Sequence, residues 1–263
     1  MEDEDDEDLS KLRQEFGKFN RYKNLVEETY LKEKCCIKRA LVLCKAMLKQ
    51  CGIRDVNDQN VVSICETLIE PAIKSTDPEL TLLAIECVGL ITILDEVVFN
   101  SYQGIFQTIL EDEEESDGKL KDKIVSLKSA VDGLIVHGIN NQESKNLFDL
   151  VVGKYLNVRN PILRQLAIEG VCKMMFSTKL CDESDNEMVE SILVSLLIQL
   201  FDKKFNRQNS LVKNVLTIFF KNFVLYSLKR AMMLLNAVTK LFFSIVVAKE
   251  DIKIGQANIR SQL

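Results

Sequence analysis

Proline and glycine are scarce in this chain, which has three prolines and ten glycines in 263 residues. Alternating runs of β-branched residues, which mark strands, do not occur either. Because the residues that interrupt helices are rare, long stretches of the chain can remain helical. The composition therefore excludes an all-β fold and predicts an all-α protein.

Residues that carry catalytic chemistry are also few. The sequence has one histidine and no Cys-x-x-Cys pair, glycine-rich phosphate loop or nucleophile elbow. That histidine, His137, precedes Gly138 at an expected helix end, where a donor meets the last carbonyls of a helix and glycine takes the left-handed cap. We predict that the protein is not an enzyme and has no catalytic residues, cofactor, metal site or small-molecule substrate.

Eight cysteines could indicate disulfides or metal ligands, but most of them occupy apolar helical positions. We interpret them as reduced, buried thiols of an intracellular protein. They are Cys35, Cys36, Cys44, Cys51, Cys65, Cys87, Cys172 and Cys181.

Two segments, one near each end of the chain, bear on targeting. Met1 is followed by seven consecutive acids, Glu2 to Asp8, where a signal peptide needs cationic and then apolar residues. The apolar stretch Ala231 to Val247 is nearly long enough to span a membrane, but Lys240 lies inside it, which costs about 2.5 to 3.5 kcal/mol. We therefore predict a protein that is not secreted, a buried helix over 231–247 and no membrane partner, with a membrane helix as the alternative.

One helix signature occurs twice, 83 residues apart (160 − 77 = 83). It begins Asp77-Pro78-Glu79-Leu80 and returns as Asn160-Pro161-Ile162-Leu163. Asp or Asn caps an unpaired N–H at a helix start, and proline suits the first helical position because it lacks that N–H. The copies then align Leu83 with Leu166, Ala84 with Ala167, Glu86 with Glu169, Cys87 with Gly170, Val88 with Val171 and Ile91 with Met174.

Half of this spacing is close to the roughly 40 to 47 residues of one helical hairpin in HEAT-type arrays. An intermediate copy covers 119–138, and a looser copy starts at Asn209-Ser210-Leu211. The small residues Ala167 and Gly170 would let a neighbouring helix approach closely. Because no single hairpin can bury such apolar faces alone, we predict an α-solenoid of stacked HEAT-type hairpins.

The domain organisation follows from these patterns. We predict an acidic, disordered head over 1–20, one HEAT array over 21–249 and a polar tail over 250–263. The predicted helices are 22–50, 58–75, 79–95, 98–111, 119–137, 143–156, 161–178, 186–202, 210–225 and 227–248.

Charge is segregated along the chain, whose net charge is −5. Acids concentrate in Glu2 to Asp8 and in Glu111 to Asp117, the second of which we interpret as a solvated turn. The segment from Phe201 to Arg230, by contrast, contains seven cations and one acid, Asp202 (7 − 1 = +6). If the cations share one face they would bind phosphates without reading bases; an ordinary solvated face is the alternative. The candidate DNA-binding residues are Lys203, Lys204, Arg207, Lys213, Lys221, Lys229 and Arg230.

Four segments in the same order resemble the condensin G subunit, also called condensin subunit 3, in its C-terminal HEAT-repeat region. Leu80 to Asp95 resembles the family segment "CLGL..LLD", and Ile124 to Gly138 resembles its "LFDLL..HG" helix. Arg164 to Met175 is similar to "A.EG.CKLL", and Asn209 to Phe220 is similar to "LRQ.L..FF".

This resemblance implies a non-catalytic subunit that serves mitotic chromosome condensation. In that family the HEAT array binds the kleisin subunit and holds double-stranded DNA without sequence specificity, while separate SMC ATPases hydrolyse ATP. The expected location is the nucleus and chromosome, with a cytoplasmic pool in interphase also allowed. The alternative is a generic HEAT scaffold or adaptor in transport or trafficking that binds proteins only.

Overall fold

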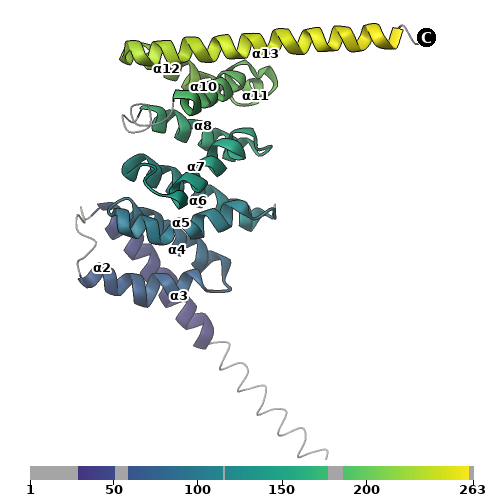
Figure 1. The fold of residues 1–263 in the computed structure, drawn as a ribbon. Helices are drawn as coiled ribbons and strands as arrows, with labels where there is room; N and C mark the ends of the chain where they lie inside the picture. The colour runs from purple at the N-terminus through teal and green to yellow at the C-terminus, as the bar shows by residue number, and fades with distance from the viewer. Residues whose placement is uncertain (1–28, 51–58, 115, 177–185, 261–263) are drawn as a thin grey trace, which may run out of the picture. The chain divides into compact units, whose positions relative to one another are not determined.

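The computed structural model describes residues 29–50, 59–114, 116–176 and 186–260 (Figure 1). The predicted acidic head over 1–20 lies outside these residues. All regular structure in the described residues is helical, as the composition predicted. The chain divides into two units, Met1–Val88 and Gly89–Leu263.

The first unit contains the helix of residues 29–50, a second helical run and the start of α4 (Pro78–Thr92). The second run was predicted as one helix over 58–75, but its middle is a π-helix: α2 (Gln59–Ile64), η1 (Cys65–Ile69) and α3 (Glu70–Ile73). The backbone N–H of Glu70 bonds the carbonyl of Cys65, five residues back. Pro71 follows directly, and since its ring crowds a normal α-turn, the wider turn accommodates it.

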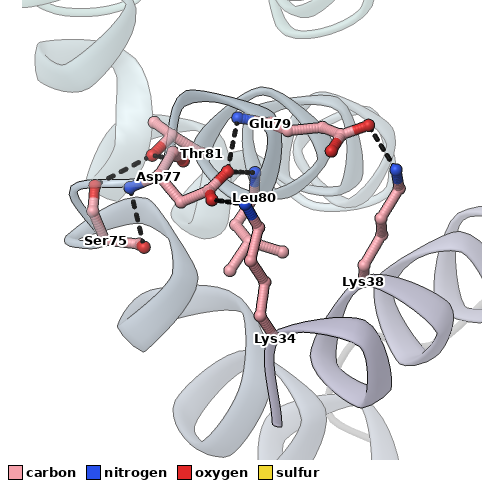
Figure 2. Close-up of polar contacts among 7 residues, drawn as sticks. All are labelled: Lys34, Lys38, Ser75, Asp77, Glu79, Leu80 and Thr81. Carbon is pink, nitrogen blue, oxygen red and sulfur yellow. Dashed lines mark hydrogen bonds and ion pairs between the residues drawn. The ribbon is translucent and has the colours of Figure 1, made fainter. Parts of the chain in front are cut away.

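The start of α4 forms as the signature predicted. Asp77 Oδ1 accepts hydrogen bonds from the backbone N–H groups of Glu79 (3.0 Å) and Leu80 (3.3 Å), as Figure 2 shows. Its other carboxylate oxygen pairs with Lys34 of the helix 29–50, and Lys38 pairs with Glu79 (Figure 2). Asp77 therefore caps one helix and also ties a second helix to it.

We expect Asp77→Ala to lower the free energy of unfolding by about 1 kcal/mol more than Asp77→Asn, because asparagine still caps the helix. The Lys34 ammonium holds the pKa of Asp77 below its ordinary value near 4. The ion pair therefore stabilises the protein above that value, and its contribution is lost as pH falls. Denaturant unfolding at pH 7 and pH 3 checks this; an Asn variant as unstable as the Ala variant would contradict the capping role.

The second unit contains the end of α4 and the helices that follow it in the sequence. Its helices are α5 (Glu96–Glu111), α6 (Asp117–His137), α7 (Gln142–Gly153), the 3₁₀ turn η2 (Tyr155–Asn157), α8 (Pro161–Phe176), α10 (Asn186–Phe201), α11 (Lys203–Gln208), α12 (Ser210–Tyr226) and α13 (Leu228–Arg260). The sequence did not predict α11.

These helices form two layers. Helix α6 packs against α8 and α8 against α12 in one layer, while α5 packs against α7 and α10 against α13 in the other (Figure 1). The first layer is built from the signature helices, so the prediction of stacked hairpins is confirmed for this unit. At the start of α8, Asn160 Oδ1 accepts from the N–H groups of Ile162 (3.0 Å) and Leu163 (3.2 Å), as Asp77 does in α4. Asn209 also precedes its helix, but its amide donates to Gln165 instead (2.8 Å).

Gly170 and Gly138 have the structural roles that were predicted. A Cβ on Gly170 of α8 would lie 2.6 Å from Cγ1 of Val131 in α6, so the close approach of these helices requires glycine. Gly138, with φ of 84°, ends α6. His137 does act as a capping donor, since its Nε2 donates to the carbonyl of Thr92 (2.7 Å), but that carbonyl ends α4 rather than α6.

The thiols differ in part from the prediction. Cys44, Cys87 and Cys172 are buried, and burial raises the pKa of Cys172, which keeps that thiol protonated. Cys35 and Cys36 are exposed on the helix 29–50, so the prediction is wrong for these two. Cys65 is half-buried, and Cys51 and Cys181 lie outside the described residues.

Helix α13 corrects two predictions. It continues to Arg260, whereas the helix was predicted to end at residue 248. The stretch 231–247 was predicted to be buried, but only one face of it packs: Met233 and Ala237 are buried, whereas Phe242 is 65% exposed. Lys240 forms an ion pair with Glu190 of α10 (2.6 Å), which holds α13 to the array. Leu228–Val247 is also the one segment among the described residues that is long and apolar enough to cross a membrane.

Candidate nucleic-acid interface

The predicted cations lie on the last three helices. Lys203, Lys204 and Arg207 belong to α11, while the remaining four belong to α12 and α13. Six of the seven are exposed, and Arg230 is buried. The structure therefore keeps six of these residues available to an external phosphate.

Three of the exposed cations surround one hollow of about 570 Å³, which we call the basic hollow. It is lined by Leu200, Phe201, Lys203, Arg207, Lys213 and Thr217. Lys204 neighbours it in sequence, whereas Lys221 and Lys229 do not line it. The hollow has no acid in its lining, so it suits an anion with several oxygens, such as the phosphates of a nucleic acid backbone.

Helix α11 brings these cations together, and it starts at Asp202. The side chain of Asp202 accepts hydrogen bonds from the backbone N–H groups of Lys204 (3.1 Å) and Phe205 (3.0 Å). This cap places Lys203 and Arg207 one turn apart on a short helix. Helix α11 was not predicted from the sequence because its six residues show no periodic apolar stripe.

Asp202, the one acid between residues 201 and 230, pairs with an arginine of another helix. Asp202 Oδ2 accepts a hydrogen bond from Nη2 of Arg164 in α8 (2.8 Å). Nε of the same guanidinium donates to Gln199 Oε1 (2.8 Å). Its Cζ atom lies 3.9 Å from the centroid of the Phe205 ring. The Phe205 N–H and the Arg164 guanidinium hold the pKa of Asp202 below its ordinary value. Its charge is balanced by Arg164 and is not available to the lysines of the hollow.

The cations of the hollow have no such partner. Within the described part of the chain, the side chains of Lys203, Arg207 and Lys213 form no ion pair, and all three are exposed. Exposed cations keep their hydration until a ligand arrives, so they provide binding free energy mainly by releasing counterions from a polyanion.

Arg230 was predicted to contact DNA, but it is buried in the structure. Its side chain is 1% exposed, with the guanidinium 3.9 Å from the Tyr226 ring centroid and 5.5 Å from that of Phe223. The guanidinium lies over these two aromatic rings, a contact that favours an arginine with little exposure. The sequence could not show this, since an arginine beside Lys229 is typical of a surface.

A second hollow, of about 660 Å³, has a mixed lining in which four acids accompany Lys123, Lys154 and Arg159. It lies beside the acidic turn, where Asp112, Glu113, Glu114 and Asp117 contribute to its wall. The turn was predicted to be merely solvated, but Lys123 donates to the carbonyl of Glu114 (2.7 Å) and Lys119 pairs with Asp112 (3.2 Å). The basic hollow, which has cations and no acid in its lining, is therefore the better candidate for a phosphate backbone.

Comparisons with known proteins agree with this architecture. The family profile described as "Nuclear condensing complex subunits, C-term domain" (Cnd3) matches residues 39–263. Condensin complex subunit 3 of Homo sapiens is 25% identical over 216 residues, which cover 71% of this chain and 20% of the human protein. This chain thus spans about a fifth of the length of that relative.

The fold also matches a solved structure, the S. pombe condensin Cnd3–Cnd2 subcomplex. The match has a TM-score of 0.66 and 20% sequence identity, and covers 82% of this chain and 29% of the other. At this identity the likeness supports the all-α HEAT solenoid fold alone. From the family match over residues 39–263, the chain belongs to the condensin subunit 3 family, in its C-terminal HEAT-repeat domain.

Proposed function

We propose that this chain acts as a non-catalytic HEAT subunit of a condensin complex, where it binds a kleisin subunit and the backbone of double-stranded DNA. The observation that carries the DNA part is the basic hollow, in which Lys203, Arg207 and Lys213 are exposed and unpaired within the described residues. Their long, flexible side chains suit contacts with phosphates, and such contacts carry no sequence information. Binding would therefore be independent of sequence.

Family membership supports the partner part of the proposal. The S. pombe relative forms a subcomplex with Cnd2, and the condensin G resemblance implies a kleisin beside separate SMC ATPases. The chain would serve mitotic chromosome condensation in the nucleus and anchor the complex, while ATP hydrolysis occurs in the SMC subunits. The alternative of a transport adaptor has no specific support in the structure.

We expect the affinity for a 30-base-pair duplex to fall steeply with salt. If three to five phosphates are neutralised, log Kd rises with log salt concentration with a slope of about 3 to 4.5, so affinity drops by at least about 50-fold between 50 and 200 mM. Fluorescence polarisation with one AT-rich and one GC-rich duplex measures both slope and sequence tolerance. A slope below about 1, or a strong preference for one duplex, would contradict backbone binding at the hollow.

Affinity purification of the tagged chain from its own cells tests the partner. A kleisin and two SMC ATPases should co-purify with it. Transport factors or vesicle proteins in their place would mean that the chain shares only the fold of condensin subunits.

A further inference from the structure

The least satisfied group among the described residues is the guanidinium of Arg230. It is 1% exposed, and its Nη1 and Nη2 atoms are buried without a hydrogen-bond partner in the described structure. A buried guanidinium carries five donors and a full charge, and proteins normally pair such a group. This arrangement is therefore incomplete as it stands.

The position of Arg230 at the start of a helix makes its unpaired charge still less favourable. Arg230 lies in the first turn of α13, and its head lies against Tyr226, the last residue of α12. Helix N-termini carry a partial positive charge, so a cation there is unfavourable. The buried acid of α10, Glu190, is occupied by Asn236 (2.8 Å) and Lys240 (2.6 Å), both farther along α13. Two positive groups thus meet at one turn, and both would be stabilised by an anion.

Arg164 shows what Arg230 lacks. Both guanidiniums stack on an aromatic ring at 3.9 Å, on Phe205 for Arg164 and on Tyr226 for Arg230. Arg164 also donates to Asp202 and Gln199, whereas no such acceptor reaches the Nη atoms of Arg230 in the described residues. The missing group is an oxygen acceptor of the carboxylate kind.

The surroundings of the turn favour a polypeptide as the source of that oxygen. Leu225 and Leu228, on either side of the turn, are 73% and 80% exposed, and Tyr226 is itself largely exposed. A hydrated phosphate backbone gains little from such apolar neighbours, whereas a peptide can cover them. Buried Arg and Tyr side chains are also the types that dominate protein–protein binding energy.

We propose that the α12–α13 turn is a docking point for a polypeptide segment that carries an Asp or Glu side chain between apolar residues. The carboxylate accepts from the Nη atoms of Arg230 once the exposed Tyr226 ring turns outward, and the apolar neighbours cover Leu225 and Leu228. This inference goes beyond the proposed function, since it depends neither on DNA nor on the identity of the partner.

Two matched variants test the unmet charge. Arg230→Met should raise the unfolding midpoint by about 2 to 5 °C, because it removes a buried cation without a partner and keeps the stacked volume. Arg164→Met should lower the midpoint by a similar amount, because it leaves Asp202 unpaired. Arg230→Lys keeps the charge and should give no gain. If Arg230→Met lowers the midpoint as Arg164→Met does, the guanidinium is already satisfied and the proposal fails.

Binding is tested with two peptides on the full chain, acetyl-Leu-Phe-Glu-Leu-Leu-amide and the same peptide with Gln for Glu. The Glu peptide should bind at least about tenfold more tightly, and the advantage should vanish in Arg230→Met. Equal binding of the two peptides, or an advantage that persists in Arg230→Met, would overturn the proposal. So would a loss of duplex DNA affinity in Arg230→Met without a change in peptide binding, which would assign Arg230 to nucleic acid.

Discussion

The variant K203E/K204E/R207E/K213E should lose at least about 1,000-fold in affinity for duplex DNA. Each exposed cation contributes about 0.5 to 1 kcal/mol to a phosphate contact, and reversing its charge adds a repulsion of about the same size, so four changes remove about 4 to 8 kcal/mol. Polarisation of a labelled duplex at 50 mM salt measures the loss.

The fold should tolerate these four changes. Lys203 and Lys204 lie in the first turn of α11, where acids are more favourable than cations, and all four side chains are exposed. Circular dichroism should therefore show unchanged helicity and an unfolding midpoint within a few degrees of the parent.

A matched variant separates the basic hollow from net charge. Replacing Lys49, Lys74, Lys121 and Lys145 with Glu changes the total charge equally but affects exposed lysines outside the hollow. Its DNA affinity should stay within about tenfold of the parent. If both variants lose affinity alike, net charge and not the hollow determines binding, and the proposed site is wrong.

Gly170→Val should lower the free energy of unfolding by about 3 kcal/mol. The added Cβ would lie 2.6 Å and 2.8 Å from the two methyl groups of Val131, so either α6 and α8 separate or Val131 leaves its rotamer. Denaturant unfolding with a fixed m-value measures the cost, which corresponds to a midpoint shift of about 6 to 12 °C.

A double variant identifies the cause of this loss. Val131→Ala removes the two methyl groups, so Gly170→Val combined with Val131→Ala should cost clearly less than the sum of the single changes. Gly104 of α5 provides the control, because a Cβ there meets nothing within 4 Å. Gly104→Ala should stabilise the helix by about 0.5 to 1 kcal/mol. Additive costs at residues 170 and 131 would contradict the steric explanation.

Local signals explain why much of the fold was predictable from the sequence. Asp77-Pro78 and Asn160-Pro161 start helices through bonds within three residues, and the structure reproduces those bonds. The small size of Gly170 likewise indicated a close helix contact before any partner was known. The caps can be read from a single sequence because they depend on neighbours along the chain, and Gly170 can be read because its small size is evident without its partner.

The site was less predictable, because it depends on residues far apart in sequence. The sequence indicated a basic segment but could not distinguish exposed Lys213 from buried Arg230, whose position is fixed by stacking on Tyr226 and Phe223. Nor could it show that Phe201 would join the cations in one hollow. The outer face of α13 was predicted to be buried for a related reason: apolar composition does not reveal whether a neighbouring helix is present to cover it.

If the basic hollow holds DNA as proposed, the bond between Arg164 and Asp202 has a mechanical consequence. Tension on a strand bound in the basic hollow would pull first on α11, a helix of six residues with little core of its own. Because Asp202 caps α11 and also binds Arg164 of α8, part of that load would pass directly into α8. Breaking the Arg164–Asp202 bond would therefore remove one route by which α8 supports this short helix.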